Sequence, residues 1–132
     1  MILPMFPLFI LYVENQEKSK TFYQSLLQKD PCLHVPGMTE FWINDQSKLG
    51  LMPNDGIAKI VHPKMPNPSD GTGIPRCEVY LLVDNAAEFY NRAIDLGAKQ
   101  ITTMQKMDWG HTVGYVADVD GHVLAFAFET KK

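Results

Sequence analysis

Cysteine is scarce in this sequence of 132 residues, which contains only Cys32 and Cys77. The two do not form a CxxC pair, and nothing in their spacing indicates a disulfide. Because small secreted domains are commonly rich in disulfides, the sequence predicts a reduced, cytoplasmic protein.

The sequence also lacks a large excess of charge of either sign. It has 12 Lys and Arg residues and 15 Asp and Glu residues, so the formal net charge is −3. A protein that binds nucleic acid usually carries a broad basic face. The sequence therefore predicts no nucleic-acid partner, and it fits a small or cationic partner better.

Long hydrophobic runs are lacking as well. Residues 1–13 are apolar, but they are shorter than the roughly 20 apolar residues that cross a bilayer. They also lack the basic start of a signal peptide and contain Pro4 and Pro7. We expect a buried strand with a proline-stiffened entry here, and no membrane partner.

The motifs of several common enzyme classes are missing too. No phosphate-binding Walker loop follows a predicted strand, and no Gly-x-Ser-x-Gly sequence marks a hydrolase nucleophile. The Gly71-Thr72-Gly73 run lacks the third glycine and the helix of a dinucleotide site. Nucleotide-binding and serine-hydrolase chemistry therefore have no support in the sequence.

The composition that is present is typical of a globular protein, with 45% hydrophobic and 20% charged residues. A chain of this length usually forms one domain. We therefore expect residues 1–132 to form a single domain, large enough to shape a pocket without disulfides or a structural metal.

Two modules with the same order of elements follow each other in the sequence. In the first, about residues 5–55, the apolar strand precedes a helix from Asn15 to Leu27, because Phe22 and Leu26 recur at helical spacing. Three further strands are predicted at 32–35, 39–44 and 48–52.

The second module, about residues 76–130, repeats this order after a linker at about 56–75 that is rich in proline and glycine. Its helix is expected from about Asn85 to Leu96, ended by Gly97. Its strands are predicted at 77–83, 99–105, 112–118 and 122–128. The fold class is therefore α+β: two βαβββ modules whose helices cover one face and whose other faces form a concave mixed sheet.

The side chains of the concave face follow from the alternation of residues along a strand. In the first strand of each module the odd-numbered apolar residues pack against the helix, so the even-numbered residues face the concavity. In the last strands the concave residues are even-numbered in the first module and odd-numbered in the second. The expected concave residues are Leu8, Ile10, Tyr12, Gly50, Met52, Glu78, Tyr80, Leu82, Val123, Ala125 and Ala127. This face is apolar, with one carboxylate.

Three stretches carry a resemblance to a known family: residues 11–15 followed by Phe22-Tyr23, residues 78–98, and the closing segment from Trp109 to Phe126. In these stretches the chain resembles the vicinal oxygen chelate superfamily, which includes glyoxalase I, extradiol dioxygenases, fosfomycin-resistance enzymes and bleomycin-resistance proteins. The resemblance implies paired βαβββ modules, in agreement with the repeat, and a homodimer.

Enzymes of this superfamily bind a divalent metal in the concavity, typically through a His on the first strand of each module and a Glu on the last strands. The resemblance places Leu8, Gly50, Glu78 and Ala125 at these positions. A catalytic metal needs about three protein ligands and an open position, and only Glu78 is a donor. No metal cofactor is expected; the alternative is a divalent metal held by other residues, such as Glu78 with His111 or His34.

Seven residues are candidates for ligand binding. Glu78 is expected to hold a ligand's cation or to act as a general base, unless it pairs with Arg76. Trp109 and His111 precede the strand predicted at 112–118, where they would close one end of the cavity over a flat ligand. Stacking or ordinary packing area is expected from Tyr12, Trp42, Met52 and Tyr80.

Three functions remain open. The first is a metal-independent small-molecule binding protein of the glyoxalase and bleomycin-resistance type, with an apolar or cationic ligand in the concavity. The second is a divalent-metal-dependent lyase, isomerase or dioxygenase of the same superfamily with an atypical metal site. The third is a non-catalytic module whose sheet edge and loop contact another protein.

Overall fold

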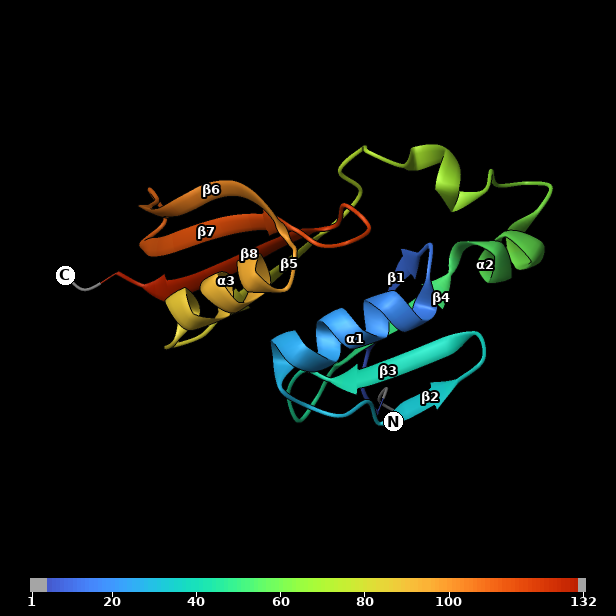
Figure 1. Ribbon diagram of the computed structural model, residues 1–132, viewed down its shortest axis with the longest axis horizontal. Coiled ribbons are helices and arrows are strands. Elements are labelled where there is room, and N and C mark those ends of the chain that lie inside the picture. Colours follow the sequence, from blue (N-terminus) through green and yellow to red (C-terminus); the bar gives the residue numbers. More distant parts are fainter. Residues whose placement is uncertain (1–4, 131–132) are drawn as a thin grey trace. The chain divides into compact units, whose positions relative to one another are not determined.

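A computed structural model describes residues 5–130 of the chain (Figure 1). Pro4 of the predicted strand entry, and both ends of the predicted domain at 1–132, lie outside the described residues. The chain divides into two compact units, the first ending at Thr72 and the second beginning at Gly73. Each unit is described by itself, and their union in a single domain stays a prediction.

The first unit contains a four-stranded mixed sheet with the strand order β1-β4-β3-β2. Strands β1 and β4 are parallel, and the other neighbours are antiparallel. Its elements, in chain order, are β1 (Leu8–Val13), α1 (Gln16–Leu27), β2 (Leu33–Val35), β3 (Met38–Trp42) and β4 (Lys48–Pro53). The predicted order of a strand, a helix and three strands is confirmed.

Helix α1 begins and ends close to its predicted bounds. The Asn15 side chain accepts a hydrogen bond from the Lys18 backbone N–H at 3.0 Å, which satisfies one of the free donors of the first turn. At the other end Gln28 adopts a left-handed φ of 55°. The buried residues between α1 and the sheet are Leu11, Val13, Ser19, Phe22, Tyr23, Leu26, Phe41, Leu49 and Leu51.

The predicted linker at about 56–75 is not without regular structure. Strand β4 continues into helix α2 (Asn54–Val61), and a short 3-10 helix, η1 (Pro68–Gly71), follows. Gly56 lowers the helical propensity of this segment, but Ile57, Ile60 and Val61 recur at helical spacing. Helix α2 buries no residue, so its amphipathic pattern is too short and too weakly packed to stand out in the sequence.

The second unit repeats the plan of the first. Its sheet has the order β5-β8-β7-β6, with β5 and β8 parallel and the other neighbours antiparallel. Its elements are β5 (Glu78–Leu82), α3 (Ala86–Asp95), β6 (Lys99–Lys106), β7 (His111–Ala117) and β8 (Val123–Glu129). Gly97 follows α3 with a φ of 100°, a conformation that favours glycine.

Helix α3 covers one face of the second sheet (Figure 1). The Phe89 ring stacks on Phe126, with centroids 5.9 Å apart. Gly114 faces Tyr90 so closely that an added Cβ would lie 2.7 Å from the Tyr90 ring. Because residues alternate along a strand, the neighbours of Gly114 and Phe126 point to the opposite, open face.

The α+β class with two βαβββ repeats is therefore confirmed. In each sheet the residues that face the helix are the ones that the alternation along the strands indicates. Among residues 5–130, no helix is long and apolar enough to span a membrane.

Candidate functional site

The open face of the second sheet has a floor of small side chains. Val113, Ala125 and Ala127 are fully buried there, and Tyr80 and Tyr115 pack against them. The strand register places Ala125 between the two tyrosines, since it is the partner of Tyr80 on β5 and of Tyr115 on β7. The three floor side chains have no exposed surface, because Tyr80, Met107 and Tyr115 cover them.

A network of three polar side chains stands on this floor. The Tyr80 hydroxyl lies 2.6 Å from His111 Nδ1, and the Trp109 indole N–H donates a hydrogen bond to the same hydroxyl at 2.9 Å. The Tyr80 and His111 rings are 5.8 Å apart between centroids. The structure therefore brings together three of the residues that the sequence predicted.

Local backbone geometry explains how Trp109 and His111 reach Tyr80. Gly110 lies between them with a φ of 90°, which favours glycine, and Thr130 donates its backbone N–H to the Gly110 carbonyl at 2.9 Å. This turn leads directly into β7, whose first residue is His111. The turn thus fixes an indole and an imidazole on the same side of the sheet.

The network can change its hydrogen bonds without changing its shape. Because Trp109 donates to the Tyr80 oxygen, the Tyr80 proton is free to point at a neutral His111 Nδ1. In the tautomer that carries its proton on Nδ1, His111 is the donor and the Tyr80 proton points elsewhere. The Trp109 ring is 56% exposed although its N–H is held, so it presents a fixed aromatic surface.

Glu78 lies toward the other end of this face, and Tyr115 lies across Ala125 from Tyr80. Glu78 is exposed, on the edge strand β5. Burial raises the pKa of Tyr115 above its ordinary value of 10.0, and the charges of Glu78 and then of Tyr80 raise it further. The Tyr115 hydroxyl is therefore protonated at neutral pH and available as a donor.

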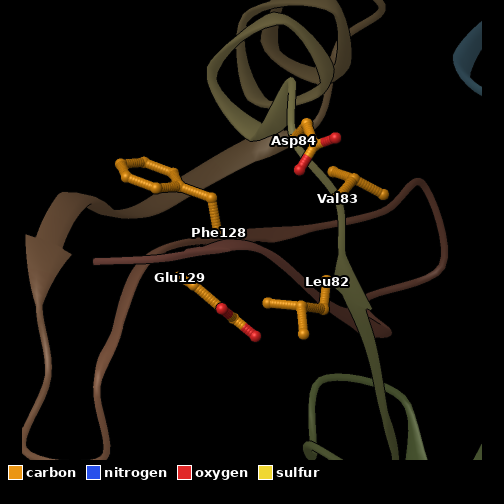
Figure 2. A pocket seen from close by; sticks show the side chains of 5 residues that line it. All are labelled: Leu82, Val83, Asp84, Phe128 and Glu129. Carbon is orange, nitrogen blue, oxygen red and sulfur yellow. The ribbon is translucent and has the colours of Figure 1, made fainter. Parts of the chain in front are cut away.

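Two hollows lie where β8 ends. The first, of about 440 Å³, is lined by Leu82, Val83, Asp84, Phe128 and Glu129 (Figure 2). In Figure 2 Leu82 and Glu129 extend to one side of their strands and Phe128 to the other, as alternation requires. The second, of about 560 Å³, is lined by Met104, Lys106, Thr112, Phe128, Glu129 and Thr130.

None of the seven predicted ligand-binding residues lines either of these two hollows. The two hollows adjoin the polar network through Glu129, because Glu129 is the register partner of His111. Of the lining residues, Leu82 and Glu129 share the open face with the network, whereas Met104, Thr112 and Phe128 lie on the helix-covered side. The second hollow therefore lies mainly on the face opposite the network.

The other predicted residues belong to the first unit. Tyr12 and Met52 are register partners on β1 and β4, and both are half-buried. The Trp42 ring packs edge-on against Phe6, with centroids 4.9 Å apart, and lies 4.8 Å from the Lys48 ammonium. Their predicted role in the same ligand site as Glu78 stays a prediction.

Sequence reasoning missed Tyr115 and Glu129 in the second unit and the Glu40–Lys48 ion pair in the first. The alternation that identified Ala125 and Ala127 also identifies Glu129 and, on β7, Tyr115, once it is extended along these strands. The signal was present but was applied to too few positions.

The metal site of the superfamily does not fit the residues present. An added Cβ at Gly50 would lie 3.2 Å from both Ile10 and Leu8, so this position is closed by apolar side chains. Ala125 is fully buried and carries no donor. Within residues 5–130, no group of three or more His, Cys, Asp or Glu residues is arranged to hold a metal ion.

His34, the other residue suggested for an atypical site, has a structural environment of its own. Its two ring nitrogens lie 2.7 Å from the Thr39 hydroxyl and 2.8 Å from a Glu17 carboxylate oxygen. These contacts connect the β2–β3 hairpin to helix α1. We therefore derive no chemical step through a metal.

Comparisons with known proteins agree with this architecture. The family model described as the Glyoxalase/Bleomycin resistance protein/Dioxygenase superfamily matches residues 6–126. An uncharacterized protein of Mycobacterium bovis is 26% identical over 115 residues, covering 85% of this chain and 75% of that protein.

Solved structures show the same fold. A glyoxalase-related enzyme from Fulvimarina pelagi superposes with a TM-score of 0.79 at 20% identity, over 96% of this chain and 89% of that chain. A protein from Agrobacterium tumefaciens gives 0.71 at 28% identity, over 100% and 99% of the two chains. A bleomycin-binding protein in complex with bleomycin gives 0.62 at 17% identity, over 96% and 98%.

Proposed function

Because the chain belongs to the glyoxalase, bleomycin resistance protein and dioxygenase superfamily, we propose that it is a small-molecule binding protein that needs no metal. The ligand is an apolar or cationic compound that lies on the open face of the second sheet. One observation carries the proposal: the Tyr80, Trp109 and His111 side chains are joined over a floor of small apolar residues.

The exposed Trp109 ring and the tyrosine rings that cover the floor supply the apolar part of recognition. Burial of apolar ligand surface contributes about 25 cal/mol per Å². The exposed Trp109 ring offers a stacking surface, and aromatic pairs add about 0.5–1.5 kcal/mol beyond burial. Since the Tyr80 hydroxyl already holds Trp109 in place, this surface is ordered before the ligand arrives, which lowers the entropy lost on binding.

The polar groups supply orientation and a preference for positive charge. Glu78 at one end and Glu129 at the other are carboxylates on the same face, on either side of the Tyr80 network. A ligand with an apolar ring and a cationic group meets the floor and a carboxylate at once. The relationship to a protein that binds bleomycin supports a ligand of this kind.

We further propose that the protein works as a cytoplasmic homodimer. Both cysteines are free, as expected in a reducing compartment. Members of the superfamily that the chain resembles are commonly dimers, and closed twofold dimers are the most common oligomers.

The proposal is tested by titrating the purified protein in the presence of EDTA with two probes, the apolar dye N-phenyl-1-naphthylamine and metal-free bleomycin. We expect saturable binding of at least one probe with one site per chain. Tyr80→Phe should weaken it about fivefold to tenfold, the effect of one hydrogen bond. After removal of EDTA, addition of nickel, zinc, iron or manganese should leave the affinity for the apolar dye unchanged.

Tyr90→Phe is the matched control, because Tyr90 lies in the same unit but faces Gly114 on the helix-covered side and donates its hydroxyl proton to the Thr102 carbonyl. It should lower stability without changing affinity. Equal losses of affinity in both variants, or no binding of either probe, would contradict the proposal. Binding that requires an added metal would favour the metal-dependent lyase, isomerase or dioxygenase instead.

A further inference from the structure

The open face of the first sheet holds a cluster that the proposed function does not use, and of its residues the sequence prediction named only Trp42. Glu40 and Trp42 lie on β3, and Lys48 is the register partner of Trp42 on β4. Thr39 and Phe41, between and beside them, are fully buried on the helix side. Alternation therefore places Glu40, Trp42 and Lys48 together on the open face.

The Lys48 ammonium is enclosed by a carboxylate and two aromatic rings. Lys48 Nζ lies 3.1 Å from Glu40 Oε1, 4.7 Å from the centroid of the Phe6 ring and 4.8 Å from that of the Trp42 ring. The Phe6 and Trp42 rings are edge-to-face. The side chains of Lys48 and Glu40 are only 16% and 13% exposed, so water is largely excluded from the pair.

These are the groups that recognise organic ammonium ions. Two aromatic faces attract a cation through their quadrupoles, and a carboxylate neutralises its charge. A lysine normally keeps its ammonium in water. Here the ammonium is drawn inward instead, which shows that the surrounding groups already form a favourable environment for such a cation.

We propose that Phe6, Trp42 and Glu40 form a binding site for an alkylammonium group, which the Lys48 side chain occupies in the free protein and leaves when a ligand's ammonium enters. The inference goes beyond the proposed function, because it concerns residues of the first unit alone. It can fail while ligand binding at Tyr80 succeeds, and the reverse also holds.

Lys48 is suited to be a removable occupant. Its ammonium group is attached to a flexible four-carbon chain, so it can move to solvent without displacement of the backbone. As a tethered group it competes with an external ammonium at an effective concentration in the millimolar range or above. The apparent affinity for a ligand is reduced by the fraction of time that Lys48 occupies the site.

The experiment removes the Lys48 ammonium from the site and measures what enters it. Lys48→Met removes the charge and leaves a flexible side chain that is one heavy atom shorter. Trp109→Phe is made in every protein tested, so that Trp42 is the one remaining tryptophan of the two in the sequence and reports binding by fluorescence. The probes are choline and its uncharged carbon analogue 3,3-dimethylbutan-1-ol.

We expect choline to bind Lys48→Met about tenfold more tightly than it binds the protein with Lys48. The reason is that the Lys48 ammonium no longer competes with choline for the cation–π contacts. The uncharged analogue should bind at least about tenfold more weakly than choline. Lys48→Arg is the matched control: it keeps a cation in the site, so the affinity for choline should remain that of the protein with Lys48.

One further variant identifies the site, and one further titration guards against loss of folding. Glu40→Gln in the Lys48→Met protein should weaken choline binding and leave the analogue unaffected. If Lys48→Met does not fold, choline is titrated into the protein that retains Lys48, where it should change Trp42 fluorescence and the analogue should not. Equal response to the two probes, or no response to choline, overturns the proposal.

Discussion

The two βαβββ units have the same topology but opposite arrangements on their open faces. In each, the first strand pairs in parallel with the last, and the other strands add antiparallel. The first unit fills its open face with its own charged side chain, Lys48, held by Glu40. The second leaves a floor of alanine and valine under a hydrogen-bonded tyrosine.

This difference shows how one backbone plan carries two roles. Where a sheet face satisfies its polar groups internally, it is stable without a ligand. Where an exposed aromatic ring is held by a hydrogen bond, as Trp109 is by Tyr80, the face offers a surface for a ligand. The units therefore differ in chemistry because of side-chain size and charge at equivalent positions, and not because of the fold.

The largest expected effect is a loss of folding stability when a methyl group is added to a tightly packed glycine. An alanine Cβ at position 114 would lie 2.6 Å from Met104 Sδ and 2.7 Å from Tyr90 Cδ1, whereas at position 50 its nearest neighbours would be at 3.2 Å. Tyr90 is anchored by its hydrogen bond to Thr102 and cannot move freely. Gly114→Ala should lower the free energy of unfolding by about 1–3 kcal/mol, and Gly50→Ala by about 1 kcal/mol or less.

Urea denaturation of both variants measures this contrast. Equal losses would mean that the helix–sheet contact in the second unit is looser than the distances indicate. A larger loss for Gly50→Ala would reverse the comparison.

The next effect compares the two polar clusters. Glu40→Gln leaves the enclosed Lys48 ammonium without its carboxylate and should cost about 1–2 kcal/mol of stability, between the ranges for exposed and buried pairs. Tyr80→Phe removes one hydroxyl beside an exposed indole that water can solvate, and should cost about 0.5–1 kcal/mol. Thermal and urea unfolding of the two variants check the order, and a larger loss for Tyr80→Phe would show that the second cluster is the structural one.

The smallest effect concerns Tyr115 on the floor of the second unit. Because burial first, and then Glu78 and Tyr80, raise its pKa above 10.0, the folded protein retains this proton more tightly than the unfolded chain. Its contribution to stability is therefore complete below pH 10 and is lost as the pH rises through the folded pKa. Glu78→Gln removes one of the causes and should lower that pKa.

The ultraviolet absorbance of tyrosinate measures this titration, and Tyr115→Phe identifies the transition that belongs to Tyr115. An unchanged Tyr115 midpoint in Glu78→Gln would show that the carboxylate is too well solvated to act on the floor.

Much of the fold was predictable, because each signal is local. Asn15 marks the start of α1 and Gly97 the end of α3 through backbone geometry that involves only neighbouring residues. Helix α2 was missed because Gly56 and a length of eight residues weaken the same kind of signal. Helix α2 and the 3-10 helix η1 lie in the stretch predicted as a linker, where no regular structure was expected.

The candidate site was predictable only in part. Tyr80, Trp109 and His111 were each expected on the open face or at its end, but the hydrogen bonds between them were not. Tyr80 is 31 residues from His111 and 29 from Trp109, and β8 lies between their strands. The Lys48 ammonium was not expected inside an aromatic site, because long charged side chains usually point to water.

The sequence by itself determined the elements, their repeat and the face that each strand residue takes, since helical spacing and strand alternation depend on near neighbours alone. The tertiary structure alone decided which side chains meet. Strand order brings Tyr80 to His111, and strand register sets Lys48 beside Trp42 and Glu129 beside His111. Those pairings arise from packing between segments that are distant in the sequence. The size of every side chain packed between those segments affects which contacts form.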